Sequence, residues 1–95
     1  MITLDSIKAE VNLLAEKYNI YSIDLFGSYA NGNATENSDI DILVKFVVPI
    51  PSIFAVMGLK EELERKIRIP VDVITLPLSR PEKLNIEKTI RIYEK

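Results

Sequence analysis

The stretch that most constrains this chain is FGSYANGNATENSDIDILV, residues 26–44. It ends in Asp39-Ile40-Asp41-Ile42, where two acids alternate with isoleucines inside a segment apolar enough to form a buried strand. In a strand, side chains two residues apart point to the same face. The pattern therefore predicts a strand over residues 39–46, with both aspartates on one face and the isoleucines turned toward a core.

The rest of the chain alternates between helical and strand-like patterns. We expect helices over residues 5–18, 52–67 and 79–88, a helical turn from Ser28, and further strands over residues 20–26, 71–76 and 90–93. Thr3 or Asp5 is the candidate cap of the first helix. This order predicts an α+β (α/β-like) fold, in which a small mixed sheet of about four strands has helices packed on it. With 95 residues, we expect one domain spanning residues 1–95.

The composition narrows the available chemistry. The chain has no cysteine and no histidine, which excludes thiolate chemistry and a histidine general base and argues against a zinc site. Carboxylates, hydroxyls and backbone amides remain, and carboxylates favour hard cations such as Mg²⁺ or Mn²⁺. A net charge of −2 argues against direct nucleic-acid binding by a broad basic face. With no apolar run of membrane-spanning length and no pattern typical of a signal peptide, we expect a cytoplasmic protein without a membrane partner.

Asp39 and Asp41 have two interpretations. Neighbouring carboxylates repel one another and raise each other's pKa unless a cation lies between them, and Mg²⁺ prefers one or two carboxylates plus phosphate oxygens. A solvent-exposed strand face explains an isolated Asp-x-Asp equally well. Gly27-Ser28 is similar: a glycine after a strand lets phosphate approach the backbone, but it also makes an ordinary turn.

A third acid, Asp72, also alternates with valines in an expected strand. If this strand lies beside residues 39–46, the three carboxylates share one face. Such a set around two cations suits phosphoryl or nucleotidyl transfer, with Asp72 as the candidate proton acceptor. The alternative is a surface aspartate on an edge strand.

The combined motif resembles the signature of the DNA polymerase β-like nucleotidyltransferase superfamily. Phe26-Gly27-Ser28, a ten-residue spacer and Asp39-Ile40-Asp41-Ile42 match its apolar-Gly-Ser and Asp-apolar-Asp-apolar elements. The longer run GSYANG…SDIDILV, with VDVI later, is similar to the minimal nucleotidyltransferase (MNT) domains. These are stand-alone domains of about this length, so the resemblance covers nearly the whole chain.

The resemblance implies a polymerase β palm-like fold and a role for each motif residue. Gly27 and Ser28 would hold the nucleotide's phosphates, and Asp39, Asp41 and Asp72 would be the metal-binding and catalytic acids, with two Mg²⁺ ions (Mn²⁺ as an alternative) and ATP as substrate. It implies transfer of AMP to a tyrosine hydroxyl of a HEPN toxin, for which the chain would be the antitoxin. Members usually carry arginine where this chain has Asn31.

Two rival functions remain open at this stage: a non-catalytic antitoxin that neutralises the toxin by stoichiometric binding, and nucleotidyl transfer to a small molecule or nucleic acid. Two surface features are also expected. The charged run over residues 60–68 is typical of a solvated helix face with i,i+4 pairs. The apolar residues near the start of the same helix exceed what one helix face buries and predict a protein interface; they are Ile50, Ile53, Phe54, Val56 and Met57.

Overall fold

The computed structural model describes residues 2–76 and 88–95. Its elements are α1 (Leu4–Ala15), β1 (Ile20–Phe26), α2 (Ser28–Asn31), β2 (Ile40–Phe46), α3 (Ile53–Ile67), β3 (Val71–Leu76) and β4 (Ile90–Glu94). The expected helix over residues 79–88 falls almost wholly outside the described residues. The other expected elements are all present: the strands over residues 20–26 and 71–76 have the expected bounds, the helical turn begins at Ser28 as expected, and the remaining elements differ at one or both ends.

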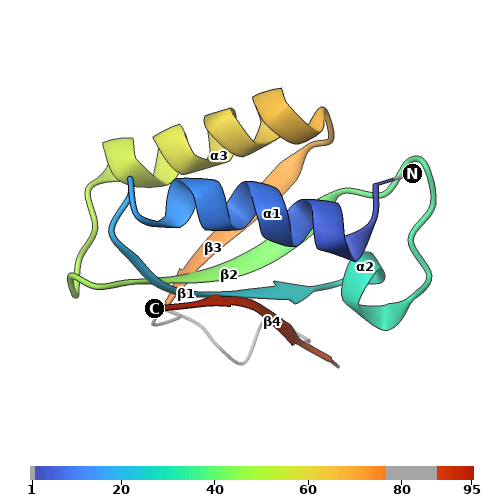
Figure 1. Cartoon of the computed structure of the whole chain (residues 1–95), viewed down its shortest axis with the longest axis horizontal. Helices are drawn as coiled ribbons and strands as arrows, with labels where there is room; N and C mark the ends of the chain where they lie inside the picture. The colour runs from blue at the N-terminus through green and yellow to red at the C-terminus, as the bar shows by residue number, and fades with distance from the viewer. Residues whose placement is uncertain (1, 77–87) are drawn as a thin grey trace.

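Four strands form one mixed sheet in the order β3-β2-β1-β4. β1 runs antiparallel to both β2 and β4, whereas β2 and β3 are parallel and are connected through α3. Helices α1 and α3 lie side by side on one face of this sheet (Figure 1). The structure thus confirms the predicted α+β class and the mixed four-stranded sheet.

Local sequence explains where the long helices begin and end. Thr3 caps α1 by accepting a hydrogen bond from the Ser6 amide at 3.2 Å, and Ser52 caps α3 in the same way through the Phe54 amide at 3.1 Å. α1 ends at Ala15, earlier than expected, and turns carry the chain to Asn19, which has a φ of 54°. Asparagine tolerates this left-handed conformation better than most residues, so it suits the entry into β1.

The core lies between the helices and the sheet. Its fully buried side chains come from alternate strand positions and from one stripe of each helix, and they include Ile7, Val11, Ile23, Leu25, Ile40, Ile42, Val44, Leu59, Leu63 and Val71. Because Ile40 and Ile42 face this core, the pleat turns Asp41 to the opposite face of the sheet.

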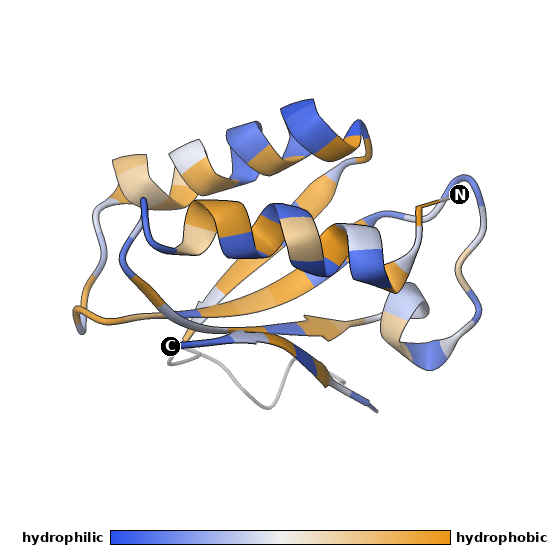
Figure 2. Ribbon diagram, viewed as in Figure 1, coloured by the Kyte–Doolittle hydropathy of each residue, from blue (hydrophilic) through white to orange (hydrophobic). Residues whose placement is uncertain are grey.

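The loop after β2 and the first turns of α3 expose apolar side chains, and we call this surface the apolar end. It comprises Val47, Val48, Ile50, Ile53, Phe54 and Met57. Figure 2 shows the hydrophobic colouring continuing from the sheet into the loop between β2 and α3. Within the described parts of the chain, no helix combines the length and apolar character needed to cross a bilayer.

Candidate active site

Gly27 connects β1 to α2 and lies directly beside Asp41. The antiparallel register pairs Phe26, the last residue of β1, with Asp41, so Gly27, which follows it, passes close to the Asp41 side chain. Gly27 has a φ of 75°, and a Cβ added there would overlap Asp41 Oδ2 and come within 3.2 Å of its Cγ. Only glycine fits this backbone conformation and this close approach.

The turn after Gly27 is short and is closed by its own backbone hydrogen bonds. The Gly27 carbonyl accepts hydrogen bonds from the amides of Ala30 at 3.1 Å and Asn31 at 2.9 Å, which closes the single turn of α2. Gly32 then ends it in the left-handed conformation. Ser28, the first residue of α2, is therefore held at the end of β1, beside the residue that contacts Asp41, while Asn31 is exposed at the far end of the turn.

Sheet pairing brings Asp72 to Asp41. The parallel register of β2 and β3 places these two residues opposite each other, so their side chains leave the sheet on the same face. The condition set on Asp72 by the sequence, that its strand lie beside that of Asp41, is met. Asp39 lies one residue before β2 begins and is exposed, so it is not in the strand, contrary to the prediction for residues 39–46.

The surroundings of Asp41 disfavour its ionised form when no cation is bound. Burial raises the pKa of Asp41 to about 6, and its hydrogen bond with the Asp72 carboxyl and the charges of Asp72 and Asp39 act in the same direction. Asp41 is thus partly shielded from water and lies next to two like charges. A cation bound here would relieve this repulsion.

The donor set fits a cation that arrives together with a nucleotide. Within residues 2–76 and 88–95, no three acidic side chains are placed to form a metal-binding group by themselves. Asp41 and Asp72 form a pair, with Asp39 contributing charge from nearby. Mg²⁺ is commonly held by one or two carboxylates plus substrate phosphates, and two adjacent carboxylates supply that share of the ligands.

One contact near the site was missed by the sequence interpretation. Glu64 and Lys60 belong to the charged run expected to be solvated, and they do form the i,i+4 pair at 3.3 Å. Both also bind the backbone of Val71, the residue before Asp72, and the hydrogen bond from its amide lowers the pKa of Glu64. The signal available in the sequence was the short connection between the expected helix over residues 52–67 and the strand over residues 71–76.

Comparison with known proteins identifies the family. Residues 7–93 match the nucleotidyltransferase domain family. This chain is a member of that family. The predicted resemblance to nucleotidyltransferases is thereby confirmed, and the family match covers β1, β2 and β3 completely and β4 up to its last residue.

Relatives and solved structures agree with this assignment. The nucleotidyltransferase is 37% identical over 94 residues to the protein adenylyltransferase MntA of Thermococcus cleftensis, covering 95% of this chain and 91% of the relative. Its fold matches a crystal structure of a toxin–antitoxin with AMP-PNP, with a TM-score of 0.76, 24% identity and coverage of 93% and 73% of the two chains. It also matches one chain in the structure of a tri-AMPylated Shewanella oneidensis HEPN toxin in complex with MNT antitoxin. That match has a TM-score of 0.72, 21% identity and coverage of 98% and 74% of the two chains. These two likenesses show a shared fold.

Proposed function

We propose that this nucleotidyltransferase transfers AMP from ATP to a tyrosine hydroxyl of a partner HEPN toxin and thereby acts as its antitoxin. The observation that carries the proposal is the pairing of Asp41 with Asp72 directly beside Gly27. It joins a carboxylate pair suited to a cation with a backbone turn suited to phosphate. The names of MntA and of the MNT–HEPN complex support the class of acceptor.

Each residue has a role in the proposed site. The Gly27 backbone and the Ser28 hydroxyl bind phosphate oxygens of ATP. Asp41 and Asp72 hold Mg²⁺, with Asp39 as a further acidic ligand. When bound, Mg²⁺ neutralises phosphate charge and so favours attack on phosphorus.

The transfer step balances without any other reactant. The acceptor oxygen forms a bond to the α-phosphorus of ATP, the bond between that phosphorus and the bridging oxygen breaks, and pyrophosphate leaves. The proton of the acceptor hydroxyl passes to a carboxylate, for which Asp72 is our candidate because the chain has no histidine.

Intact-protein mass spectrometry tests this proposal. The chain is incubated with ATP, Mg²⁺ and a HEPN-domain protein encoded beside it, and we expect the partner to gain one or more AMP groups. Asp41→Ala and Asp39→Ala should lower the rate at least about 1000-fold while the circular dichroism spectrum stays that of the wild type. The exposed acid Glu61 gives a control, because Glu61→Ala should label the partner at the wild-type rate.

Two outcomes would redirect the proposal. Labelling of the partner by Asp41→Ala at the wild-type rate would refute the assigned site. Neutralisation of the toxin in cells by the Asp39→Ala/Asp41→Ala double variant would favour an antitoxin that acts by binding alone, a function to which the exposed apolar end is suited.

A further inference from the structure

Two charged side chains of α3 bind the first residue of β3 through its backbone. Glu64 Oε2 accepts a hydrogen bond from the Val71 amide at 2.8 Å, and Lys60 Nζ donates to the Val71 carbonyl at 3.1 Å. The two side chains also bond to each other, at 3.3 Å between Lys60 Nζ and Glu64 Oε2. Both polar groups of one peptide residue are thus satisfied by a single ion pair.

The position of Val71 explains why it needs side-chain partners. β3 is an edge strand, with β2 on its one paired side. The Ile40 amide bonds to the Pro70 carbonyl at 2.9 Å, so Pro70 points toward β2. Backbone groups of successive residues point to opposite sides of a strand, and those of Val71 therefore point outward from the sheet edge. Among the residues that the structure describes, Lys60 and Glu64 are the partners of the Val71 backbone at this edge of the sheet.

The connection from α3 to β3 is short and is hydrogen-bonded to the end of the helix. The Arg68 amide bonds to the Glu64 carbonyl at 2.8 Å and ends the helix in the left-handed conformation. Ile69 and Pro70 then lead directly into Val71, whose side chain is fully buried. Glu64 therefore binds both the end of its own helix, through its carbonyl, and the start of the next strand, through its carboxylate.

The residue after Val71 is Asp72, which faces Asp41 across the parallel pair. The two carboxylates repel each other, and an edge strand has a neighbour on only one side to oppose its displacement. Bonds that hold Val71 from the outer side of the sheet counteract this displacement where β3 begins. Any shift of Val71 moves the Asp72 carboxylate relative to Asp41.

We propose that Lys60 and Glu64 are positioning residues of the active site, which hold Val71 so that Asp72 stays opposite Asp41 in the geometry that binds the metal–nucleotide complex. This inference rests on the proposed function for the ligand of the site. The placement of Asp72 itself follows from the hydrogen bonds and the strand register.

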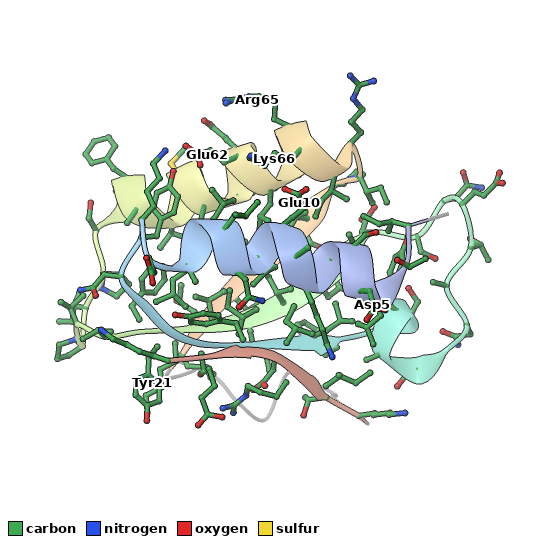
Figure 3. The ribbon with its side chains drawn as sticks, in the orientation of Figure 1. Asp5, Glu10, Tyr21, Glu62, Arg65 and Lys66 are labelled. Atoms are coloured by element: carbon green, nitrogen blue, oxygen red, sulfur yellow. The ribbon has the colours of Figure 1, made fainter. Side chains whose placement is uncertain are left out.

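Glu64→Ala tests the role of the pair, with Glu62→Ala as the matched control. Glu62 lies on the same helix (Figure 3) and also forms an ion pair, with Lys17 of the segment after α1, but among the described residues it makes no hydrogen bond or ion pair with β3. We expect Glu64→Ala to weaken the affinity for Mn²⁺ in the presence of a non-hydrolysable ATP analogue by about 10- to 100-fold, the usual effect of removing a group that orients a metal ligand. Glu62→Ala should change this affinity less than about twofold.

A second measurement follows the strand itself without ligand. Amide hydrogen exchange at Asp72 should become at least about tenfold faster in Glu64→Ala than in Glu62→Ala, because the start of β3 then opens more often. Glu64→Gln should restore most of the metal affinity, since its amide oxygen can still accept the Val71 hydrogen bond. Lys60→Met, which keeps the apolar stem, removes the bonds of Lys60 Nζ to the Val71 carbonyl and to Glu64, and should weaken the metal affinity less than Glu64→Ala because the Val71 amide keeps its partner.

The outcomes separate this inference from the proposed function. Equal metal affinity and equal Asp72 exchange in Glu64→Ala and Glu62→Ala would overturn the positioning role, even if the wild type labels its partner. A wild type that binds the metal–nucleotide complex but transfers no AMP would refute the proposed function, while the affinities and exchange rates still decide the role of Glu64. A wild type that binds no metal–nucleotide complex would overturn both.

Discussion

The surroundings of the two ends of β2 each contain an arrangement that is unfavourable in the isolated protein: neighbouring acids at one end and exposed apolar side chains at the other. At its start, Asp41 is partly shielded from water beside the like charge of Asp72. At its other end, the chain exposes large apolar side chains, with Ile50 88% and Phe54 82% accessible. A bound cation reduces the repulsion between two carboxylates. A bound protein removes exposed apolar surface from water. In the proposed function, nucleotide chemistry takes place at one end of β2 and recognition of the acceptor protein at the other.

The start of β2, where Asp41 lies beside Asp72 and which we call the acid end, depends on a close approach that only glycine allows. Gly27→Ala should lower AMP transfer by more than about 100-fold, because its Cβ would displace the Asp41 carboxylate and its φ of 75° strains any other residue. Gly32→Ala is the matched control, since Gly32 has a φ of 81° but its added Cβ meets nothing within 4 Å. Initial rates and circular dichroism measure both. Equal loss of activity in the two variants would reduce the effect to backbone strain.

The apolar end should matter for binding and not for folding. Ile50→Ser/Phe54→Ser is expected to weaken affinity for the acceptor protein by about 10- to 100-fold. The free energy of unfolding should change by less than about 0.5 kcal/mol per site because both side chains are already exposed. Leu59→Ala, on the buried face of α3, should instead lower the free energy of unfolding by about 2–5 kcal/mol. Isothermal titration calorimetry and urea unfolding measure the two quantities, and unchanged affinity in the double variant would place recognition elsewhere.

The smallest expected effect concerns pH at the acid end. The pKa of Asp41 is raised to about 6 in the folded protein, so the stability that its protonated form contributes is present below the ordinary aspartate pKa and is lost as the pH rises through about 6. With metal removed by a chelator, Asp41→Asn should therefore be more stable than the wild type near neutral pH. After allowance for solvent screening, the expected gain is on the order of 1 kcal/mol.

Urea unfolding at about pH 4.5 and 7.5 checks this prediction. The difference in stability between the wild type and Asp41→Asn should be smaller at the lower pH, because Asp41 is then mostly protonated in the folded protein and, like asparagine, carries no charge there. A difference that is the same at both pH values would contradict the raised pKa.

The sequence was sufficient where one physical rule dominated. The alternation of Ile40, Asp41 and Ile42 specified a strand and the faces of its side chains, and Thr3 and Ser52 are strong caps that mark where the long helices begin. That Asp72 joins Asp41 depended on which strands are neighbours, and the alternation pattern contains no information on strand order. The motif resemblance made that pairing an expectation before the register demonstrated it.

Tertiary contacts account for what the sequence pattern did not give. Asp39 continues the alternation but lies outside β2. The strand begins at Ile40, whose amide donates a hydrogen bond to the Pro70 carbonyl. Lys60 and Glu64 match an ordinary solvated i,i+4 pair, and their contact with Val71 exists only because the chain reverses within a few residues after α3. A hydrogen bond from a side chain to the backbone of another element produces no periodic pattern in the sequence.

In the proposed function, Asp41 and Asp72, beside Gly27 and Ser28, hold a metal-bound nucleotide. Crystals grown with Mn²⁺ and a non-hydrolysable ATP analogue, measured at a wavelength where manganese scatters anomalously, test it most directly. We predict an anomalous peak between the Asp41 and Asp72 carboxylates, with a phosphate against the Gly27–Ser28 turn. Manganese bound elsewhere, with both carboxylates free of it, would contradict the account.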